Sequence, residues 1–207
     1  MTAAMEMSRW DRAQQAERGY WYPADTGARS ARRLEERERQ TWYAGLLHIA
    51  DEWNRPDSVI ELGAGPAGLT TRDLARRGLR SVAVEPMELE SVDREFYALA
   101  DVDLVRARAE DYKGEPAAEV WLVNVLQHVE EPAAVVAAAQ RLALRTVRVF
   151  EWVHEPTSVV HLHTIAPRLI LDAFAEWHLA YATEGRARTP NWSQEFVAYV
   201  FERRWDR

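Results

Sequence analysis

Cysteine is missing from this sequence altogether. Its absence excludes disulfide bonds, thiolate zinc sites and cysteine nucleophiles together. Long apolar runs are missing as well: none approaches the roughly 18 residues of a membrane-spanning helix, and the polar start MTAAMEMSRWDR lacks the apolar centre of a signal peptide. We therefore expect a cytoplasmic protein that has no membrane partner.

Positive charge is in deficit, with 26 Lys and Arg against 33 Asp and Glu and a formal net charge of −7. The arginines are interleaved with glutamates, as in ARRLEERERQ, and we interpret the Glu/Arg run at 29–39 as a solvated helix face. Because no basic stripe forms, we expect no nucleic-acid partner. His154, His161 and His163 lie near Glu151 in the sequence, but no second cluster with ligand spacing accompanies them, so we predict no metal site.

The chain alternates between strand and helix patterns. With 207 residues, 47% of them apolar, it can bury one core. Residues 1–55 are predicted to form an N-terminal helical extension, and residues 56–207 one structural unit. The alternation predicts an α/β, three-layer Rossmann-like fold, with a mostly parallel seven-stranded sheet and an antiparallel C-terminal strand. The expected strands are 58–62, 80–86, 102–110, 118–126, 145–153, 178–185 and 194–204, and the expected helices are 3–19, 28–53, 67–78, 87–100, 130–143 and 167–177.

A glycine-rich turn follows the first predicted strand, in the stretch SVIELGAGPAG of residues 58–68. Gly63 and Gly65 allow the backbone to turn sharply and a ligand to approach closely, because no Cβ intervenes. Glu85 ends the next predicted strand, where a carboxylate can accept hydrogen bonds from ribose hydroxyls. These features fit the loop of flavin and nicotinamide proteins as well as the loop of enzymes that bind S-adenosylmethionine.

Glu61 favours the second of these ligands. It lies two residues before Gly63, in a strand expected to be buried on both faces, where an unpaired carboxylate would cost roughly several kcal/mol. Dinucleotide-binding proteins normally have an apolar residue at this position. An acid is explained if it faces a cationic ligand or fixes the glycine loop, and S-adenosylmethionine carries both an ammonium and a sulfonium group.

Three stretches resemble one family. VIELGAGPAG is similar to the first motif of class I S-adenosylmethionine-dependent methyltransferases, VWLVNVLQHVEEPAAVV at 120–136 resembles their fourth-strand motif, and RARAEDY at 106–112 resembles their third motif. The resemblance implies S-adenosyl-L-methionine as cofactor and S-adenosyl-L-homocysteine as product. The cofactor-binding residues that it implies are Glu61, Gly63, Ala64, Gly65, Glu85, Met87, Ala109, Glu110, Asn124 and Val125.

Residues outside the cofactor motifs are candidates for catalysis and for substrate binding. His128 lies near the expected reaction centre, where a neutral imidazole can act as a catalytic base or can orient the loop. The stretch WDRAQQAERGYW resembles the leading helix that folds over the cofactor as a lid in many small methyltransferases. The pocket is expected between the N-terminal helices, the 154–168 segment and the 185–193 loop. The expected substrate-pocket residues are Trp10, Gln14, Tyr20, Trp21, His161, His163 and Trp192.

The resemblance implies methyl transfer to an oxygen or nitrogen nucleophile of a small-molecule acceptor by in-line displacement. Three alternatives stay open. The enzyme could consume S-adenosylmethionine by cyclisation or aminocarboxypropyl transfer, with release of methylthioadenosine. The chain could be a non-catalytic partner that binds this cofactor, or an oxidoreductase that binds a flavin or nicotinamide. We expect a monomer or a homodimer.

Overall fold

The computed structural model describes residues 7–49, 56–71, 78–189 and 192–204. Its centre is a seven-stranded sheet in the order β3-β2-β1-β4-β5-β7-β6. The pairs among β1 to β5 are parallel, whereas β7 runs antiparallel to both β5 and β6. The predicted sheet is therefore confirmed. Its strands are β1 (Ser58–Leu62), β2 (Arg80–Val84), β3 (Val102–Val105), β4 (Ala117–Val123), β5 (Ala143–Val153), β6 (His178–Thr189) and β7 (Trp192–Glu202).

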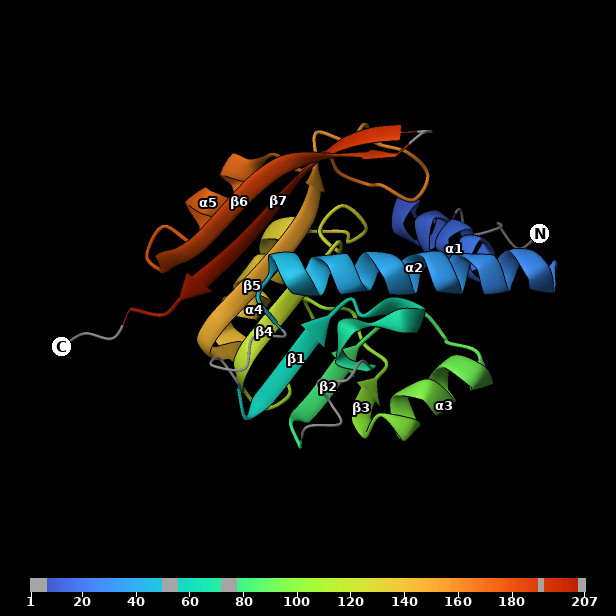
Figure 1. The fold of residues 1–207 in the computed structure, drawn as a ribbon, viewed down its shortest axis with the longest axis horizontal. Helices are drawn as coiled ribbons and strands as arrows, with labels where there is room; N and C mark the ends of the chain where they lie inside the picture. The colour runs from blue at the N-terminus through green and yellow to red at the C-terminus, as the bar shows by residue number, and fades with distance from the viewer. Residues whose placement is uncertain (1–6, 50–55, 72–77, 190–191, 205–207) are drawn as a thin grey trace, which may run out of the picture.

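Helices cover both faces of the sheet. Figure 1 shows α2 crossing one face, with α1 beside its N-terminal half. Alternate strand residues supply two cores: Ile60 and Leu62 pack in the cluster that α4 and α5 join, whereas Val59 packs in the cluster of α2. None of the described helices is long and apolar enough to cross a membrane. The helices are α1 (Arg9–Trp21), α2 (Thr26–Leu46), α3 (Ser91–Leu99), α4 (Pro132–Leu142) and α5 (Pro167–Ala173).

The two N-terminal helices begin at capping side chains. The Ser8 hydroxyl accepts a hydrogen bond from Asp11 N at 3.0 Å, and the Asp11 carboxylate accepts one from Ser8 N at 3.3 Å, which together form a capping box. Asp25 caps α2 by accepting from backbone N–H groups of its first turn. These caps place the first residues of the helices at Arg9 and Thr26, whereas the predicted ranges 3–19 and 28–53 begin at residues 3 and 28. The first residues of the range 3–19 and the last residues of the range 28–53 lie outside the described part of the chain.

The helix predicted over 67–78 differs from the structure. Where it is described, this segment follows the 3₁₀ turn η1 (Gly65–Ala67) and forms a second one, η2 (Leu69–Thr71). The reason is tertiary: the carboxylate of Glu61 accepts hydrogen bonds from two backbone N–H groups of η2. Residues 72–77 lie outside the described part.

The loop predicted over 186–193 is largely strand. β6 extends to Thr189, and β7 begins at Trp192, so the described parts of this segment belong to a hairpin. Arg186 forms an ion pair with Glu195 on the facing strand. The polar sequence of this segment suggested a loop, but cross-strand pairing keeps it in the sheet.

A buried ion pair joins the sheet to the end of α2. Arg148 of β5 donates to both carboxylate oxygens of Glu119 in β4, at 2.7 and 2.9 Å, and their side chains are 1% and 2% exposed. Trp121 Nε1 donates to the same carboxylate at 3.0 Å. A further guanidinium N–H of Arg148 donates to the Leu47 carbonyl at 2.6 Å. Each of the two buried charges is therefore neutralised by its partner, and Arg148 also attaches the C-terminal end of α2 to the sheet.

We predict that Glu119→Ala lowers the free energy of unfolding by about 3–5 kcal/mol, because Arg148 would keep a buried charge without a partner. A double variant with Met at both positions should recover only part of this loss, because the unpaired charge is gone but Trp121 Nε1 and the Leu47 carbonyl lose these partners. Urea unfolding measures both effects. The exposed pair of Asp57 and Arg145 provides the control, since Asp57→Asn should cost less than about 1 kcal/mol. Equal losses for Glu119→Ala and Asp57→Asn would contradict this account of the buried pair.

Candidate functional site

A cavity of about 380 Å³ lies at the carboxyl ends of the parallel strands. Gly63, Glu85 and Asn124, which follow β1, β2 and β4, contribute to one wall, and residues of α1 and α2 contribute to the other. In a parallel sheet, ligands bind at this edge, between loops that leave neighbouring strands. The predicted cofactor-binding residues that line the cavity are Gly63, Ala64, Gly65, Glu85, Ala109, Glu110, Asn124 and Val125.

Glu61 fixes the glycine loop from beneath. Its side chain is buried, with Oε1 accepting from Leu69 N at 2.9 Å and Oε2 accepting from Thr70 N and Thr70 Oγ1, both at 2.8 Å. Burial raises the pKa of its carboxyl, and these hydrogen bonds counter the rise. Glu61 is not among the described residues that line the cavity. Of the two roles that the sequence allowed, the structure therefore supports fixing the loop.

Glu85 joins the glycine loop to the segment after β2 and also faces the cavity. Its Oε2 accepts from Gly65 N at 2.8 Å, and its Oε1 accepts from Met87 N at 2.8 Å. Burial, followed by the negative charge of Glu17, raises the pKa of Glu85 to about 8. Met87 contributes this N–H, but its side chain packs in the core under α3 and is not among the described residues of the cavity wall.

Glu151 is a third buried carboxyl, and sequence reasoning considered it only for a metal site. Its Oε1 accepts from Val125 N and Leu126 N, both at 2.7 Å, and thereby holds the turn that follows β4. Burial raises its pKa to about 8. The available signal was the acid inside the apolar strand RVFEWV, which repeats the placement of Glu61 in SVIEL.

The glycines of the loop meet two different requirements. Gly63 has φ of 74°, and an added Cβ would lie 2.1 Å from Val125 Cγ2, so no side chain fits there. Gly65 has φ of 64°, but an added Cβ would have no atom within 4 Å. The first glycine thus permits close packing against the turn that follows β4, and the second leaves the backbone open toward the cavity. A loop of this shape, with Glu85 beside it, fits an adenosyl ligand.

His128 lies at the cavity wall with a defined tautomer. Its Nδ1 is 3.2 Å from the Val160 carbonyl, which can only accept, so Nδ1 carries the hydrogen and Nε2 is left as an acceptor. Burial lowers the pKa of His128 to about 4, which keeps the imidazole neutral near pH 7. Asn124, also at the wall, has φ of 54°, and its Oδ1 accepts from Gln127 Nε2 at 2.8 Å.

Of the predicted pocket residues that follow His128 and whose side chains are described, one lines the cavity and the other does not. The His161 ring is 4.9 Å from that of His128 and lines the cavity, whereas His163 bonds to the Glu130 carbonyl at 3.0 Å and is not among its described lining residues. Trp192 is the first residue of β7, and its side chain is not among those that the structure describes. Within the described residues, no group of histidine and acidic side chains could hold a metal ion.

One face of α1 supplies part of the second wall. Trp10, Gln14, Tyr20 and Trp21 all line the cavity, together with Glu17, which the sequence analysis did not select. Positions 10, 14, 17 and 21 follow helical spacing, so this periodicity was the missed signal. Burial raises the pKa of Glu17 to about 7, and a hydrogen bond from Trp21 counters the rise.

The middle of α2 lines the cavity with Glu36, Arg39 and Gln40. The interpretation of the Glu/Arg run at 29–39 as a solvated face was therefore wrong for Glu36 and Arg39. Arg39 forms ion pairs with Glu35 and Glu36, and Gln40 Nε2 donates to Glu36 at 2.9 Å. Alternating charges could not reveal which side of the helix faces α1 and the sheet, because that depends on how α2 is docked.

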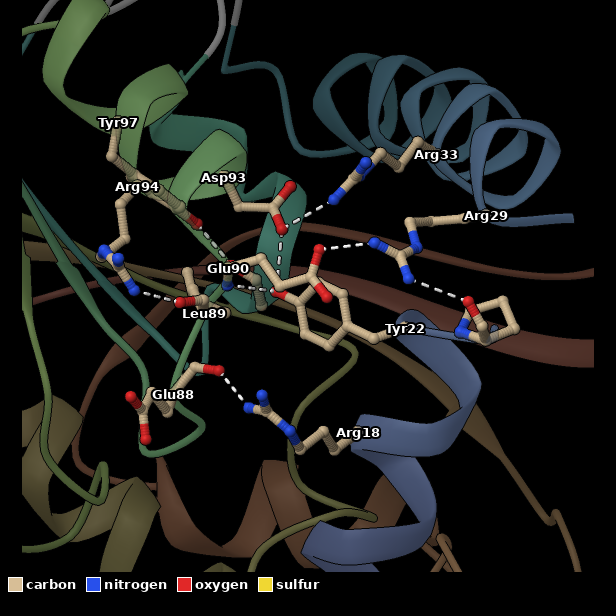
Figure 2. Close-up of polar contacts among 12 residues, drawn as sticks. Arg18, Tyr22, Arg29, Arg33, Glu88, Leu89, Glu90, Asp93, Arg94 and Tyr97 are labelled. Carbon is tan, nitrogen blue, oxygen red and sulfur yellow. Dashed lines mark hydrogen bonds and ion pairs between the residues drawn. The ribbon is translucent and has the colours of Figure 1, made fainter. Parts of the chain in front are cut away.

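A polar network docks the corner between α1 and α2 onto Glu90 and Asp93, which follow β2 in the chain (Figure 2). Tyr22 Oη donates to Asp93 Oδ2 at 2.8 Å, and Arg33 donates to the same oxygen at 2.8 Å. Arg29 forms an ion pair with Glu90 at 2.6 Å. The segment that leaves β2 after Glu85 thus holds the two helices that close the cavity.

Comparisons with known proteins agree with this geometry. A family model described as a methyltransferase domain matches residues 60–150. The structure is similar to a 1,6-didemethyltoxoflavin-N1-methyltransferase from Burkholderia thailandensis, with a TM-score of 0.70, 15% identity, and coverage of 98% of this chain and 93% of that one. It is also similar to magnesium protoporphyrin IX methyltransferase from Synechocystis PCC 6803 with bound SAM, with a TM-score of 0.64, 15% identity, and coverage of 99% and 100%.

No curated protein sequence matches the chain closely enough to add to these comparisons. The family match covers the glycine loop, Glu85 and the turn after β4, and it decides between the two ligands that the loop allowed. The strand order of the whole sheet agrees with it. Residues 60–150 therefore match a methyltransferase domain, and the described sheet and helices form a Rossmann-like fold similar to that of these S-adenosylmethionine-dependent methyltransferases.

Proposed function

We propose that this methyltransferase acts on a small-molecule acceptor and transfers the methyl group to an oxygen or nitrogen nucleophile by in-line displacement. The observation that carries the proposal is one cavity that joins the glycine loop and Glu85 to His128 and His161. Its volume of about 380 Å³ is in the range of small-ligand sites. The similar enzymes support this acceptor class, because their names describe action on 1,6-didemethyltoxoflavin and on magnesium protoporphyrin IX.

We assign the residues along the cavity to parts of the cofactor. Glu85 would accept hydrogen bonds from the ribose hydroxyls, and the backbone at Gly63 and Gly65 would lie against the adenosyl group. Ala109 and Glu110 would border the adenine. The remaining assignments are Asn124 and Val125 at the methionine part, with Trp10, Gln14, Tyr20 and Trp21 of α1 as a wall above the ligand. We propose that residues 1–55 act as a lid through this wall.

The protein's contribution to the reaction is mainly alignment. S-adenosylmethionine supplies, when bound, a methyl carbon on a sulfonium whose neutral thioether is a good leaving group. The cavity walls would hold the acceptor in line with that carbon and exclude water, which can contribute ~7–11 kcal/mol. Where the acceptor must lose a proton, His128 Nε2 would take it, since Nδ1 already donates to the Val160 carbonyl.

Product analysis separates methyl transfer from its alternatives. We expect that incubation with S-adenosylmethionine and a panel of small-molecule acceptors yields S-adenosylhomocysteine, detected by mass spectrometry of the nucleoside product. Methylthioadenosine would instead indicate cyclisation or aminocarboxypropyl transfer. Binding without either product, across the whole panel, would favour a non-catalytic partner.

We predict that S-adenosylhomocysteine binds more tightly as the pH rises from about 6 to 8. The raised pKa of Glu85, about 8, leaves its carboxyl largely protonated at neutral pH. Ribose hydroxyls donate to the ionised form, so binding releases that proton, and affinity increases with pH by up to about 10-fold per unit. Calorimetry in two buffers of different ionisation enthalpy measures the release. Glu85→Gln should bind weakly and lose most of this pH dependence; an unchanged dependence would contradict the assignment.

We predict that His128→Asn lowers kcat by about 10²–10⁴-fold if the imidazole accepts the proton of the acceptor. Binding of S-adenosylhomocysteine, measured by calorimetry, should change little. Because the pKa of His128 is lowered to about 4, its protonation should not reduce the wild-type rate between pH 7 and about 5. The matched control is His163→Asn, whose ring contacts the Glu130 carbonyl. Similar small losses for both variants would show that no base acts at position 128.

A further inference from the structure

Glu17 places a second carboxyl at the part of the cavity that contains Glu85. Both residues line the cavity, Glu85 from the end of β2 and Glu17 from α1. Their charges interact, because Glu17 is the largest charged contribution to the raised pKa of Glu85. In the described part of the chain, no positively charged side chain counters the raised pKa of Glu17. Two carboxyls thus line one cavity, and the charge of Glu17 raises the pKa of Glu85.

Such a pair is unfavourable unless a ligand gives it hydrogen-bond donors or positive charge. Each carboxylate oxygen of Glu85 accepts a hydrogen bond from one backbone N–H, and each keeps a lone pair for a further donor. Glu17 has the indole N–H of Trp21 as one donor, and Gln14 Nε2 lies 3.5 Å from its Oε2. Both side chains are therefore oriented and can still accept.

The position of Glu17 is set by the docking of α1. Arg18, the next residue along the helix, donates to the Glu88 carbonyl, and Tyr22 is hydrogen-bonded to Asp93 (Figure 2). Both contacts attach α1 to the segment that directly follows Glu85. The two carboxyls are therefore held by one connected piece of structure, and both line the same cavity.

We propose that Glu17 is a second ribose-binding residue, which accepts a hydrogen bond from one hydroxyl of the adenosyl ligand while Glu85 accepts from the other. This inference rests on the proposed assignment of Glu85. A vicinal diol offers two O–H donors and matches two carboxylates that approach it from different elements. The contact joins α1 directly to the ligand, so that ribose recognition also holds the lid. A phosphate on the ribose would face both carboxylates and be repelled.

Calorimetry at about pH 9 tests this, because both carboxyls are then mostly ionised. The ligands are S-adenosylhomocysteine and its 2′-deoxy and 3′-deoxy analogues, and the variants are Glu17→Gln and the control Glu38→Gln, the same change at an exposed position of α2. We expect Glu17→Gln to weaken S-adenosylhomocysteine binding about 10-fold. For one of the two deoxy analogues, the difference between Glu17→Gln and wild type should disappear, because the hydroxyl that Glu17 binds is gone. Glu38→Gln should match wild type for all three ligands.

Two outcomes would overturn the inference. Equal weakening of all three ligands by Glu17→Gln would mean that Glu17 acts through the packing of α1, and unchanged binding of all three would mean that it does not contact the ribose. If the wild-type protein bound none of the three ligands, the proposed function itself would fail, and this inference with it.

Discussion

The site depends on carboxyl groups that are buried at the ends of neighbouring strands. Glu61, Glu85 and Glu151 lie at or near the carboxyl ends of β1, β2 and β5, and each accepts two backbone N–H groups from a loop at the cavity edge. Removing these carboxyls from water is unfavourable, and the N–H groups offset that loss. Loops that would otherwise be mobile are thereby held in one arrangement around the ligand space.

The second structural requirement is a helix that is fixed at both ends. Near its N-terminus, α2 is bound through Arg29 and Arg33 to the segment after β2 and to α3. Past its C-terminus, the Leu47 carbonyl accepts from the buried Arg148. This helix crosses the sheet and positions α1, which it meets at the corner shown in Figure 2. The closing wall of the cavity is therefore attached to the same strands that carry the glycine loop.

Much of the fold could be predicted from the sequence, because the alternation of apolar strands with amphipathic helices is a local pattern. The wall of the cavity at the strand ends was also predictable, since its residues lie in short motifs next to those ends. The 3₁₀ turns after the glycine loop were not, because they depend on the Glu61 carboxylate. Neither was the extended hairpin of β6 and β7, whose polar residues are held by pairing with each other.

The sequence by itself determined the fold class, the glycine loop and the acid at position 85, because each follows from residue types at fixed spacing. Only the tertiary structure decided which polar side chains face the ligand. It turned Glu17 of α1 and Glu36 of α2 toward the cavity, and it directed His163 to the Glu130 carbonyl. The physical reason is that helix docking selects one face of each helix, and it does so through contacts between residues far apart in the chain.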